Sequence, residues 1–196
     1  MPNPQMTVVD AFEKGRSFSH WQAKPVSETL LHDLYEMLKW GPTSANCCPL
    51  RILFVQSEAE KAKLVECVSD GNKEKVESAP VTAILAFDPE FYEKLPFLYP
   101  HTDAKSWFAG EENEEAAQET AFRNSSLQAA YFMIAARAVG LDCGPMSGFD
   151  KEALEAAFLK EKGFKVNMIC SLGYGRTEEL HPRSPRLSFD EAAEII

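Results

Sequence analysis

The sequence predicts an α/β or α+β sandwich in which helices cover a central β-sheet. Three short apolar segments, at residues 51–55, 81–87 and 165–172, have the length and composition of buried strands. Longer segments between them carry apolar residues at helical spacing. Because helices alternate with apolar strands, a layered fold around one sheet is the expected architecture.

The length of the chain favours one domain. At 196 residues it can bury a sizeable core, and 45% of its residues are hydrophobic. The sequence holds no internal repeat, low-complexity tract or Gly/Ser-rich linker at which a second domain could begin. We therefore expect residues 1–196 to form a single domain.

The first predicted helix spans residues 26–40. Ser27 is its expected N-cap, four leucines share one face, and a Gly-Pro pair then ends it. Residues 51–55 form the first predicted strand, which we expect to be buried. Residues 57–60 read Ser-Glu-Ala-Glu, the pattern of a capping box that opens a second helix. Its inward residues are Leu64, Val65 and Val68.

The middle of the chain holds the most apolar strand and the longest helix. Residues 81–87 are apolar almost throughout, so this strand should be covered on both faces. The long helix spans residues 111–139, and Gly140 ends it. Large apolar residues recur along it at helical spacing: Phe122, Leu127, Tyr131, Ile134 and Ala138.

The last third of the chain begins with a predicted loop at residues 144–149. Asp150 then caps another helix, and residues 165–172 form the third strand. A second capping-box pattern, at residues 188–191, starts a short C-terminal helix.

Residues 88–110 fit neither a helical nor a strand period. A loop of this length is uncommon in a compact domain, and its aromatic content argues against disorder. We expect this segment to pack over a pocket or over a partner subunit, and the sequence leaves the choice open. Its aromatic residues are Phe91, Tyr92, Phe97, Tyr99, Trp107 and Phe108.

The charge balance excludes one large class of partner. A formal net charge of −10 argues against a nucleic-acid-binding surface, which needs clustered Lys and Arg. A small anionic ligand is still allowed if a few cations converge locally. No apolar run approaches the roughly 20 residues that span a bilayer, so no membrane partner is expected.

The compartment is predicted from the cysteines and the N-terminus. Five cysteines without framework spacing fit a reducing compartment better than a disulfide scaffold. Residues 1–10 lack a basic stretch followed by an apolar core, so they do not form a secretory signal. A cytoplasmic location is therefore expected.

A polar turn lies between the first helix and the first strand. Thr43, Ser44 and Asn46 supply two hydroxyls and an amide there, which could contact a heteroaromatic edge or a ribityl chain. The residue chemistry alone favours a polar turn that only ends a helix. The adjacent Cys47 and Cys48 could form a redox or metal site, but packing is favoured, because no partner has zinc spacing. We predict no metal.

Five blocks of sequence occur in a characteristic order. They lie at residues 16–26, 41–49, 72–76, 140–150, and 172–175 with 182–186. In that order they resemble the nitroreductase-like family of FMN-dependent NAD(P)H oxidoreductases, over nearly the whole chain. The resemblance implies a helix-flanked, mainly antiparallel sheet and a homodimer with FMN at the subunit interface, each site built from both chains.

The resemblance also implies which residues bind the cofactor. The FMN phosphate would meet arginines and serines from the two ends of the chain, and Ser19 stands where many members have a second basic residue. Cys48 replaces the family's usual Gln. The residues that would contact the phosphate are Arg16, Ser17, Ser19, Arg183 and Arg186, and those that would contact the ribityl chain or ring edge are Thr43, Ser44 and Asn46. Asn72 and Lys75 would lie beside the pyrimidine end of the ring, and the backbone of Pro145, Ser147 and Gly148 would face its reactive edge.

The same resemblance assigns one side chain a catalytic role. Hydride arriving at N5 of FMN leaves negative charge near N1 and O2, and Lys75 would stabilise that charge. The alternative is an exposed lysine on a charged helix. Because the sequence holds no Gly-x-Gly-x-x-Gly motif, the nicotinamide of NAD(P)H would stack directly on FMN in a ping-pong cycle.

Finer similarities point to one branch of the family. The malonic semialdehyde reductase (RutE) branch is similar to this sequence at residues 39–47, 91–93, 100–101, 106–108, 122–126 and 144–150. That resemblance implies reduction of 3-oxopropanoate to 3-hydroxypropanoate in pyrimidine catabolism. Arg123 would then bind the acidic substrate.

Other functions stay open at this level. His101 could donate a proton to substrate, or lie in a surface loop. The first alternative is a broad-specificity NAD(P)H nitroreductase or quinone reductase. The second is a non-catalytic flavin-binding redox sensor. The sequence gives neither the electron acceptor nor the preference between NADH and NADPH.

Overall fold

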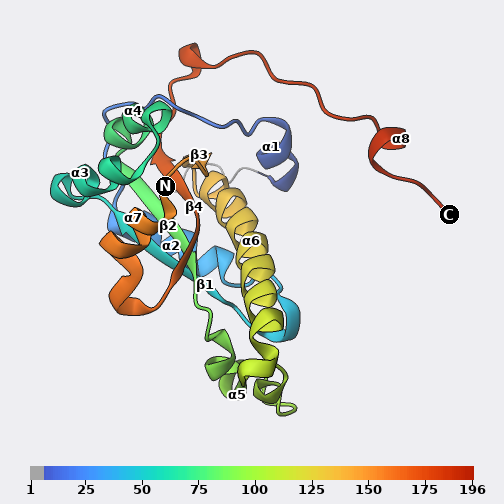
Figure 1. Ribbon diagram of the computed structural model, residues 1–196. Coiled ribbons are helices and arrows are strands. Elements are labelled where there is room, and N and C mark those ends of the chain that lie inside the picture. The colour runs from blue at the N-terminus through green and yellow to red at the C-terminus, as the bar shows by residue number, and fades with distance from the viewer. Residues whose placement is uncertain (1–6) are drawn as a thin grey trace.

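Four strands form the central sheet of the computed structural model, which describes residues 7–196 (Figure 1). The strand order is β1-β2-β4-β3, and every neighbouring pair is antiparallel. The predicted α+β sandwich with a mainly antiparallel sheet is confirmed. The strands are β1 (Leu50–Val55), β2 (Val81–Phe87), β3 (Asp142–Met146) and β4 (Lys165–Gly173).

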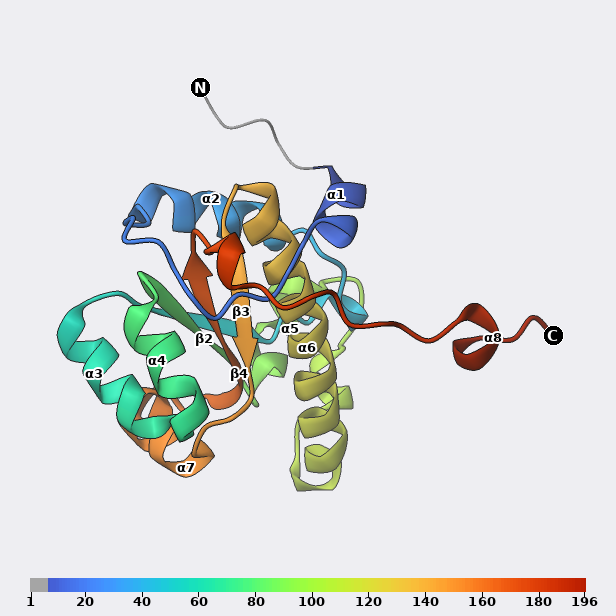
Figure 2. The same cartoon turned by 90° about the horizontal axis from the view of Figure 1, so that it is seen from above.

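Helices cover both faces of this sheet. In Figure 2, α2 and α6 lie on one side of the strands, and α3, α4 and α7 lie on the other. The helices are α1 (Val8–Glu13), α2 (Glu28–Leu38), α3 (Glu58–Cys67), α4 (Asp70–Ser78), α5 (Leu95–Leu98), α6 (Glu114–Ala138), α7 (Lys151–Leu154) and α8 (Phe189–Ala192). Short 3-10 turns occur at Ser44–Asn46, Phe91–Lys94, Lys105–Trp107, Glu111–Asn113, Lys160–Lys162 and Thr177–Glu179, and a π-turn at Glu155–Leu159.

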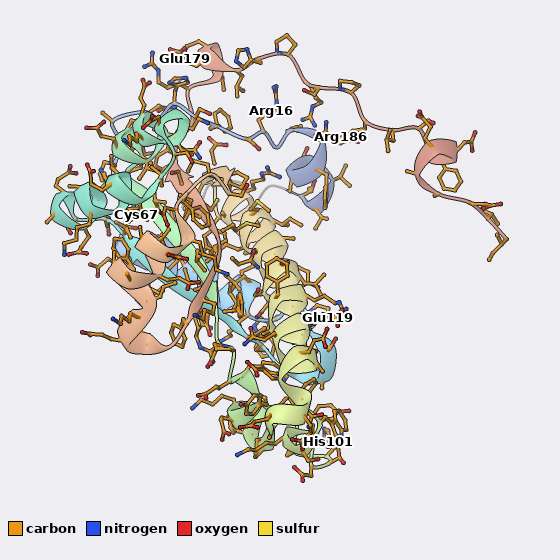
Figure 3. The ribbon with its side chains drawn as sticks, in the orientation of Figure 1. Arg16, Cys67, His101, Glu119, Glu179 and Arg186 are labelled. Atoms are coloured by element: carbon orange, nitrogen blue, oxygen red, sulfur yellow. The ribbon has the colours of Figure 1, made fainter. Side chains whose placement is uncertain are left out.

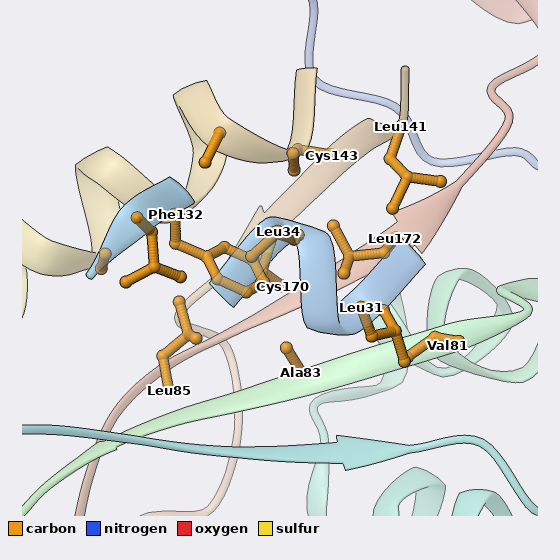
Figure 4. Close-up of a cluster of buried hydrophobic side chains, with 14 of the residues drawn as sticks. Leu31, Leu34, Val81, Ala83, Leu85, Phe132, Leu141, Cys143, Cys170 and Leu172 are labelled. Atoms are coloured by element: carbon orange, nitrogen blue, oxygen red, sulfur yellow. The ribbon is translucent and has the colours of Figure 1, made fainter. Parts of the chain in front are cut away.

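Strand β2 divides the core into two layers. Its residues are all buried, as predicted, and they alternate between the two faces. Val81, Ala83 and Leu85 pack in the cluster under α2 and α6, part of which Figure 4 shows. Ile84 and Ala86 pack in the cluster under α3, α4 and α7. Fully burying a large aliphatic side chain contributes roughly 1.5–3 kcal/mol, so β2 stabilises both layers.

Most of the predicted helix ends are confirmed. The side chains of Ser27 and Asp150 cap α2 and α7, and Ser188 forms the capping box of α8. Gly140, at φ 89°, ends α6, and the N–H of Leu141 reaches back to Ala136 O at 2.8 Å. This is the Schellman arrangement that a glycine permits.

Two predictions about the first half were wrong in detail. The capping box of α3 is only half formed: Ser57 Oγ accepts from Glu60 N, but no reciprocal bond is present. β1 is half-buried rather than buried, apart from Val55. It lies at the edge of the sheet, where it has one strand neighbour instead of two.

The loop predicted at residues 144–149 is wrong for its first three residues. Gly144, Pro145 and Met146 belong to β3 and pair with β4. Glycine and proline are poor strand formers, which hid the strand in the sequence. Proline is tolerated because β3 is an edge strand, where a missing N–H leaves no broken ladder bond.

The predicted apolar stripe of the long helix does not face the core. Phe122 is 53% exposed and Leu127 is 43% exposed. The buried face of α6 instead carries mainly small and polar residues beside Phe132, among them Asn124, Ser125 and Gln128. The helix also begins at Glu114, after a 3-10 turn, and not at residue 111.

The aromatic segment at residues 88–110 folds onto its own chain. Short helical turns and α5 place Phe91, Leu95 and Ala104 in a separate cluster with Ala117 and Ala121 of α6. Phe91 and Phe108 meet edge-to-face, with ring centroids 5.1 Å apart. The segment therefore covers the N-terminal half of α6.

After Gly175 the chain leaves the body as an extended arm, defined as residues 176–196. It projects past α1 and carries the short helix α8 (Figure 1). Leu187, Phe189, Ile195 and Ile196 of the arm are exposed. Within residues 7–196 no helix combines the length and apolarity needed to cross a membrane. The prediction that residues 1–10 are not a signal falls mostly on residues 1–6, outside those described.

Candidate functional site

A cavity of about 910 Å³ lies between the strap, defined as residues 14–22, and the arm. The cavity brings together the five residues that the resemblance assigns to a phosphate and one further lysine. Figure 3 shows Arg16 and Arg186 at the same end of the molecule. The predicted lining residues are Arg16, Ser17, Ser19, Lys75, Arg183 and Arg186. The lining residues that were not predicted include His20, Arg137, Glu179 and His181.

The strap is fixed along the free edge of β3. Ser17 bridges Cys143, and Phe18 N donates to Cys143 O at 2.9 Å. A Cβ on Gly144 would lie 2.4 Å from Phe18 O, so only glycine permits this close approach. Trp21 Nε1 also donates to Lys75 O at 3.3 Å, which ties the strap to α4.

The strap and the arm hold each other through arginine side chains. Arg16 Nη2 donates to His181 O on the arm. In the opposite direction, Arg183 Nη2 donates to Glu13 O at 2.7 Å and Gly15 O at 3.0 Å. Arg186 Nη1 donates to Ser184 O and Pro185 O, two carbonyls of its own segment. The strap and the arm, two segments far apart in sequence, thus form one wall of the cavity.

A second group of predicted residues meets beside this cavity. Lys75 Nζ donates to Asn72 Oδ1 at 3.0 Å, and Asn72 Nδ2 donates to Gly148 O at 2.9 Å. A Cβ on Gly148 would stand 2.7 Å from Asn72 Nδ2, so the glycine permits the contact. Pro145, in β3, is half-buried, and Ser147, just after β3, is exposed.

The third predicted group, in the turn after α2, lies elsewhere. None of Thr43, Ser44 and Asn46 lines the strap cavity. Thr43 Oγ1 accepts from Cys48 N at 3.2 Å, and Asn46 Nδ2 donates to Leu98 O at 2.9 Å. The structure therefore divides the predicted residues of one chain between two places.

The turn itself is strained. Ala45, Asn46 and Cys48 have φ values of 47°, 50° and 39°. Asparagine tolerates this left-handed region, but for other non-glycine residues such strain costs on the order of 1–3 kcal/mol. Strain of this kind persists only where surrounding contacts impose it.

Two buried amides of α6, which the sequence analysis missed, impose the shape of the turn. Asn124 Oδ1 accepts from Ser44 N, and Gln128 Oε1 accepts from Leu50 N, both at 2.9 Å. Asn124 and Gln128 are one helical turn apart, so one face of α6 holds both ends of the turn. In the sequence Asn124 belongs to the block at residues 122–126, while Gln128 is marked only by its polarity on a helix that otherwise packs on the sheet.

The two predicted substrate residues are remote from the strap cavity. Figure 3 places His101 at the opposite end of the molecule from Arg16. His101 is exposed and meets Tyr99 edge-to-face, with ring centroids 5.5 Å apart. Arg123 forms an exposed ion pair with Glu119 on α6.

The five cysteines are free, and four of them are buried. Cys47 packs in the aromatic cluster, and burial raises the pKa of its thiol to about 11. Cys48 is half-buried, and its Sγ donates to Asn46 Oδ1 at 3.4 Å. Among residues 7–196, no group of three His, Cys, Asp or Glu side chains could hold a metal ion.

The electrostatics of the strap cavity set it apart from the rest of the chain. Although the protein carries a formal net charge of −10, five cationic side chains line this one cavity. Hydroxyls of Ser17 and Ser19 supply donors between them. Such a donor set suits a phosphate, which needs cations and hydrogen-bond donors. The cations are Arg16, Lys75, Arg137, Arg183 and Arg186.

Comparisons with known proteins place the chain among nitroreductases. The model of the Nitroreductase family matches residues 14–174. A protein of Ralstonia nicotianae named "Putative NADH dehydrogenase/NAD(P)H nitroreductase" is 50% identical over 197 residues, covering all of both chains. Among solved structures, the "putative nitroreductase" ydfN of Bacillus subtilis superposes with a TM-score of 0.88 at 25% identity, over 96% of this chain and 98% of that one.

A second solved structure carries a ligand in its description. It is a "putative nitroreductase" of Exiguobacterium sibiricum in complex with FMN. Its TM-score is 0.86 at 22% identity, and each chain is covered completely. At this identity the likeness concerns the fold.

Proposed function

The chain belongs to the nitroreductase family, and from that premise we propose that it is an FMN-dependent oxidoreductase that uses NAD(P)H. The observation that carries the proposal is the convergence of five cationic side chains on the strap cavity of an acidic protein. A phosphomonoester dianion supplies the negative charge that this cavity lacks. The FMN-bound relative of the same fold supports the choice of cofactor.

The donor set fits FMN on a further point. Arg137 Nε is buried and has no hydrogen-bond partner among the described residues. A buried donor without a partner costs roughly 1–3 kcal/mol, and Arg137 lines the same cavity as the other four cations. We assign the phosphate to Arg16, Ser17, Ser19, Arg183 and Arg186.

The Asn72–Lys75–Gly148 network has the chemistry of the ring site. When bound, FMN supplies the redox step, accepting hydride from NAD(P)H and delivering it to an acceptor in a ping-pong cycle. Asn72 holds Lys75 Nζ in place, and Lys75 fixes a positive charge where the reduced ring is anionic. The backbone of Pro145, Ser147 and Gly148 borders the reactive edge, and no side chain needs to transfer a proton in the hydride step.

We propose that the working form is a homodimer, with residues 1–196 forming one domain in each subunit. Thr43, Ser44 and Asn46 lie apart from the strap cavity, and a second subunit could bring its own turn to it. Exposed apolar residues on α6 and the arm supply surface for such an interface. A cytoplasmic location belongs to the same proposal.

As the acceptor we propose malonic semialdehyde, reduced to 3-hydroxypropanoate as in pyrimidine catabolism. The support is the resemblance of residues 39–47, 106–108 and 144–150 to that branch of the family. Arg123 would bind the substrate carboxylate and His101 would donate a proton, which requires the second subunit. A broad-specificity nitroreductase or quinone reductase is the second candidate, favoured by the names of the relatives.

An absorption spectrum and a titration test the core of the proposal. We expect a yellow protein, or one that takes up added FMN, whose flavin bands bleach on anaerobic addition of NADH or NADPH. A colourless protein that takes up no FMN overturns the proposal. Steady-state assays with malonic semialdehyde and with nitroaromatics then separate the two acceptors, and turnover of neither, with slow reoxidation, indicates a redox sensor.

A further inference from the structure

Arg137 is the cation of the strap cavity that no sequence block singled out. It lies in the last turn of α6, where the negative end of the helix dipole favours a cation. Among residues 7–196 it makes no ion pair, unlike Arg51, Arg123 and Arg176. Its charge is therefore balanced by a helix end and not by a carboxylate in contact.

The two terminal nitrogens of Arg137 hold the start of the strap. Nη1 donates to Ala11 O at 3.0 Å, and Nη2 donates to Arg16 O at 3.3 Å. These two bonds join Arg137 to the end of α1 and to Arg16, the first residue predicted to bind the phosphate. Because a rigid helix carries Arg137, the planar guanidinium fixes the direction in which the chain leaves α1.

Gly15 makes room for this contact. A Cβ at that position would lie 2.6 Å from Arg137 Nη1 and 2.2 Å from Ala11 O. The guanidinium thus lies flat against the backbone at Gly15. From the other side, Arg183 donates to the carbonyls of Glu13 and Gly15, so two arginines clamp this bend.

The charge of Arg137 acts on the carboxylate of Asp142. Burial raises the pKa of Asp142, and Arg137 acts in the opposite direction on it. Asp142 Oδ2 is already engaged by Gly175 N at 2.8 Å. Arg137 Nε is buried and has no hydrogen-bond partner among the described residues.

We propose that Arg137 is a positioning residue for the phosphate of FMN: it holds the backbone at Arg16 in the binding geometry and adds a fixed, partly buried charge to the cavity. The inference rests on the proposed function. It predicts a loss of affinity for the phosphate and not for the isoalloxazine ring. Riboflavin, which has the same ring and ribityl chain without the phosphate, separates the two effects.

The test measures dissociation constants of FMN and riboflavin for the apoprotein by fluorescence quenching. For Arg137→Met we expect FMN to bind about 10- to 100-fold more weakly, since charge-assisted hydrogen bonds are lost. Riboflavin affinity should change less than about threefold. Arg137→Lys retains the charge without the planar fork and should give an intermediate loss for FMN only.

The control is Lys63→Met on α3, which removes one exposed positive charge far from the cavity and should change neither constant. Equal losses for FMN and riboflavin would assign Arg137 a merely structural role, and no loss for either would also overturn the proposal. If Arg137→Met does not fold, Arg137→Lys carries the same comparison. A wild-type protein that binds neither flavin refutes the proposed function itself, whatever the variants do.

Discussion

Lys75 is the side chain whose position matters most for the proposed chemistry. It lies on α4, lines the strap cavity and is held by Asn72 at 3.0 Å. A sequence alone cannot tell such a lysine from an exposed one, since α4 is rich in charge. The difference comes from the contact with Asn72, which in turn is bound to Gly148 O.

Replacement of Lys75 by Met should lower the reduction potential of bound FMN. The loss of a charge near the reduced ring is worth on the order of 1–2 kcal/mol, or about 20–40 mV for a two-electron couple. Lys73→Met is the matched control, because Lys73 pairs with Asp70 on the same helix and does not line the cavity. Anaerobic dye titration measures both; equal potentials in wild type and Lys75→Met would contradict the assignment.

The raised pKa of the Cys47 thiol predicts that the free energy of unfolding depends on pH. Its folded-state pKa is raised to about 11 from 9.0, so the folded protein holds this proton more tightly than the unfolded chain. The thiol's contribution is complete below pH 9 and is lost as pH rises towards 11. Urea unfolding from pH 8 to 11 should therefore show a steeper fall for wild type than for Cys47→Ala. Parallel curves would rule out the effect.

At the scale of elements, one buried face of α6 both packs on the sheet and holds the strained turn. Small residues such as Ala129 pack on the sheet, while Asn124 and Gln128 hold the strained turn. The periodicity of large apolar residues therefore pointed to the wrong face. In the sequence a buried amide looks the same as a solvated one, and only the structure shows that these two amides contact the turn.

Removing one amide should release the turn. Asn124→Leu leaves Ser44 N without its acceptor, at a cost of roughly 1–3 kcal/mol in the free energy of unfolding. Asn124→Asp retains an acceptor oxygen and should restore part of that loss. Gln118→Leu, an exposed change on the same helix, is the control for helix propensity. Urea titrations compare the three, and a loss as large in the control would refute this role.

At the scale of the molecule, the central strand with its covering layers was easier to predict from the sequence than the edge strands of the sheet. β2 was predictable because it is covered on both faces and reads as one apolar run. β3 was missed because Pro145 and Gly144 suit only an edge, and an edge depends on which strands are neighbours. Likewise the family blocks contain many of the residues that line the strap cavity, but Arg137 stands outside those blocks and its contacts depend on the tertiary fold.

The exposed stripe of α6 predicts how the chain associates. Leu127→Glu places a charge on that stripe and should convert the proposed dimer into monomers. Sedimentation velocity measures the mass, and Lys63→Glu on α3 should leave it unchanged. A monomeric wild type, or a Leu127→Glu variant of unaltered mass, would contradict an interface on this face.

The half-covered strand β1 has a practical consequence for anyone who handles the protein. Five of the six residues in its sequence, Leu-Arg-Ile-Leu-Phe-Val, are apolar, and among the described residues it has a strand neighbour on one side only. A row of free backbone N–H and C=O groups on such a strand is a template for stacking against foreign strands. Preparations in which this edge is uncovered should therefore precipitate as fibrous material, and a charge placed at Ile52 should improve their shelf life.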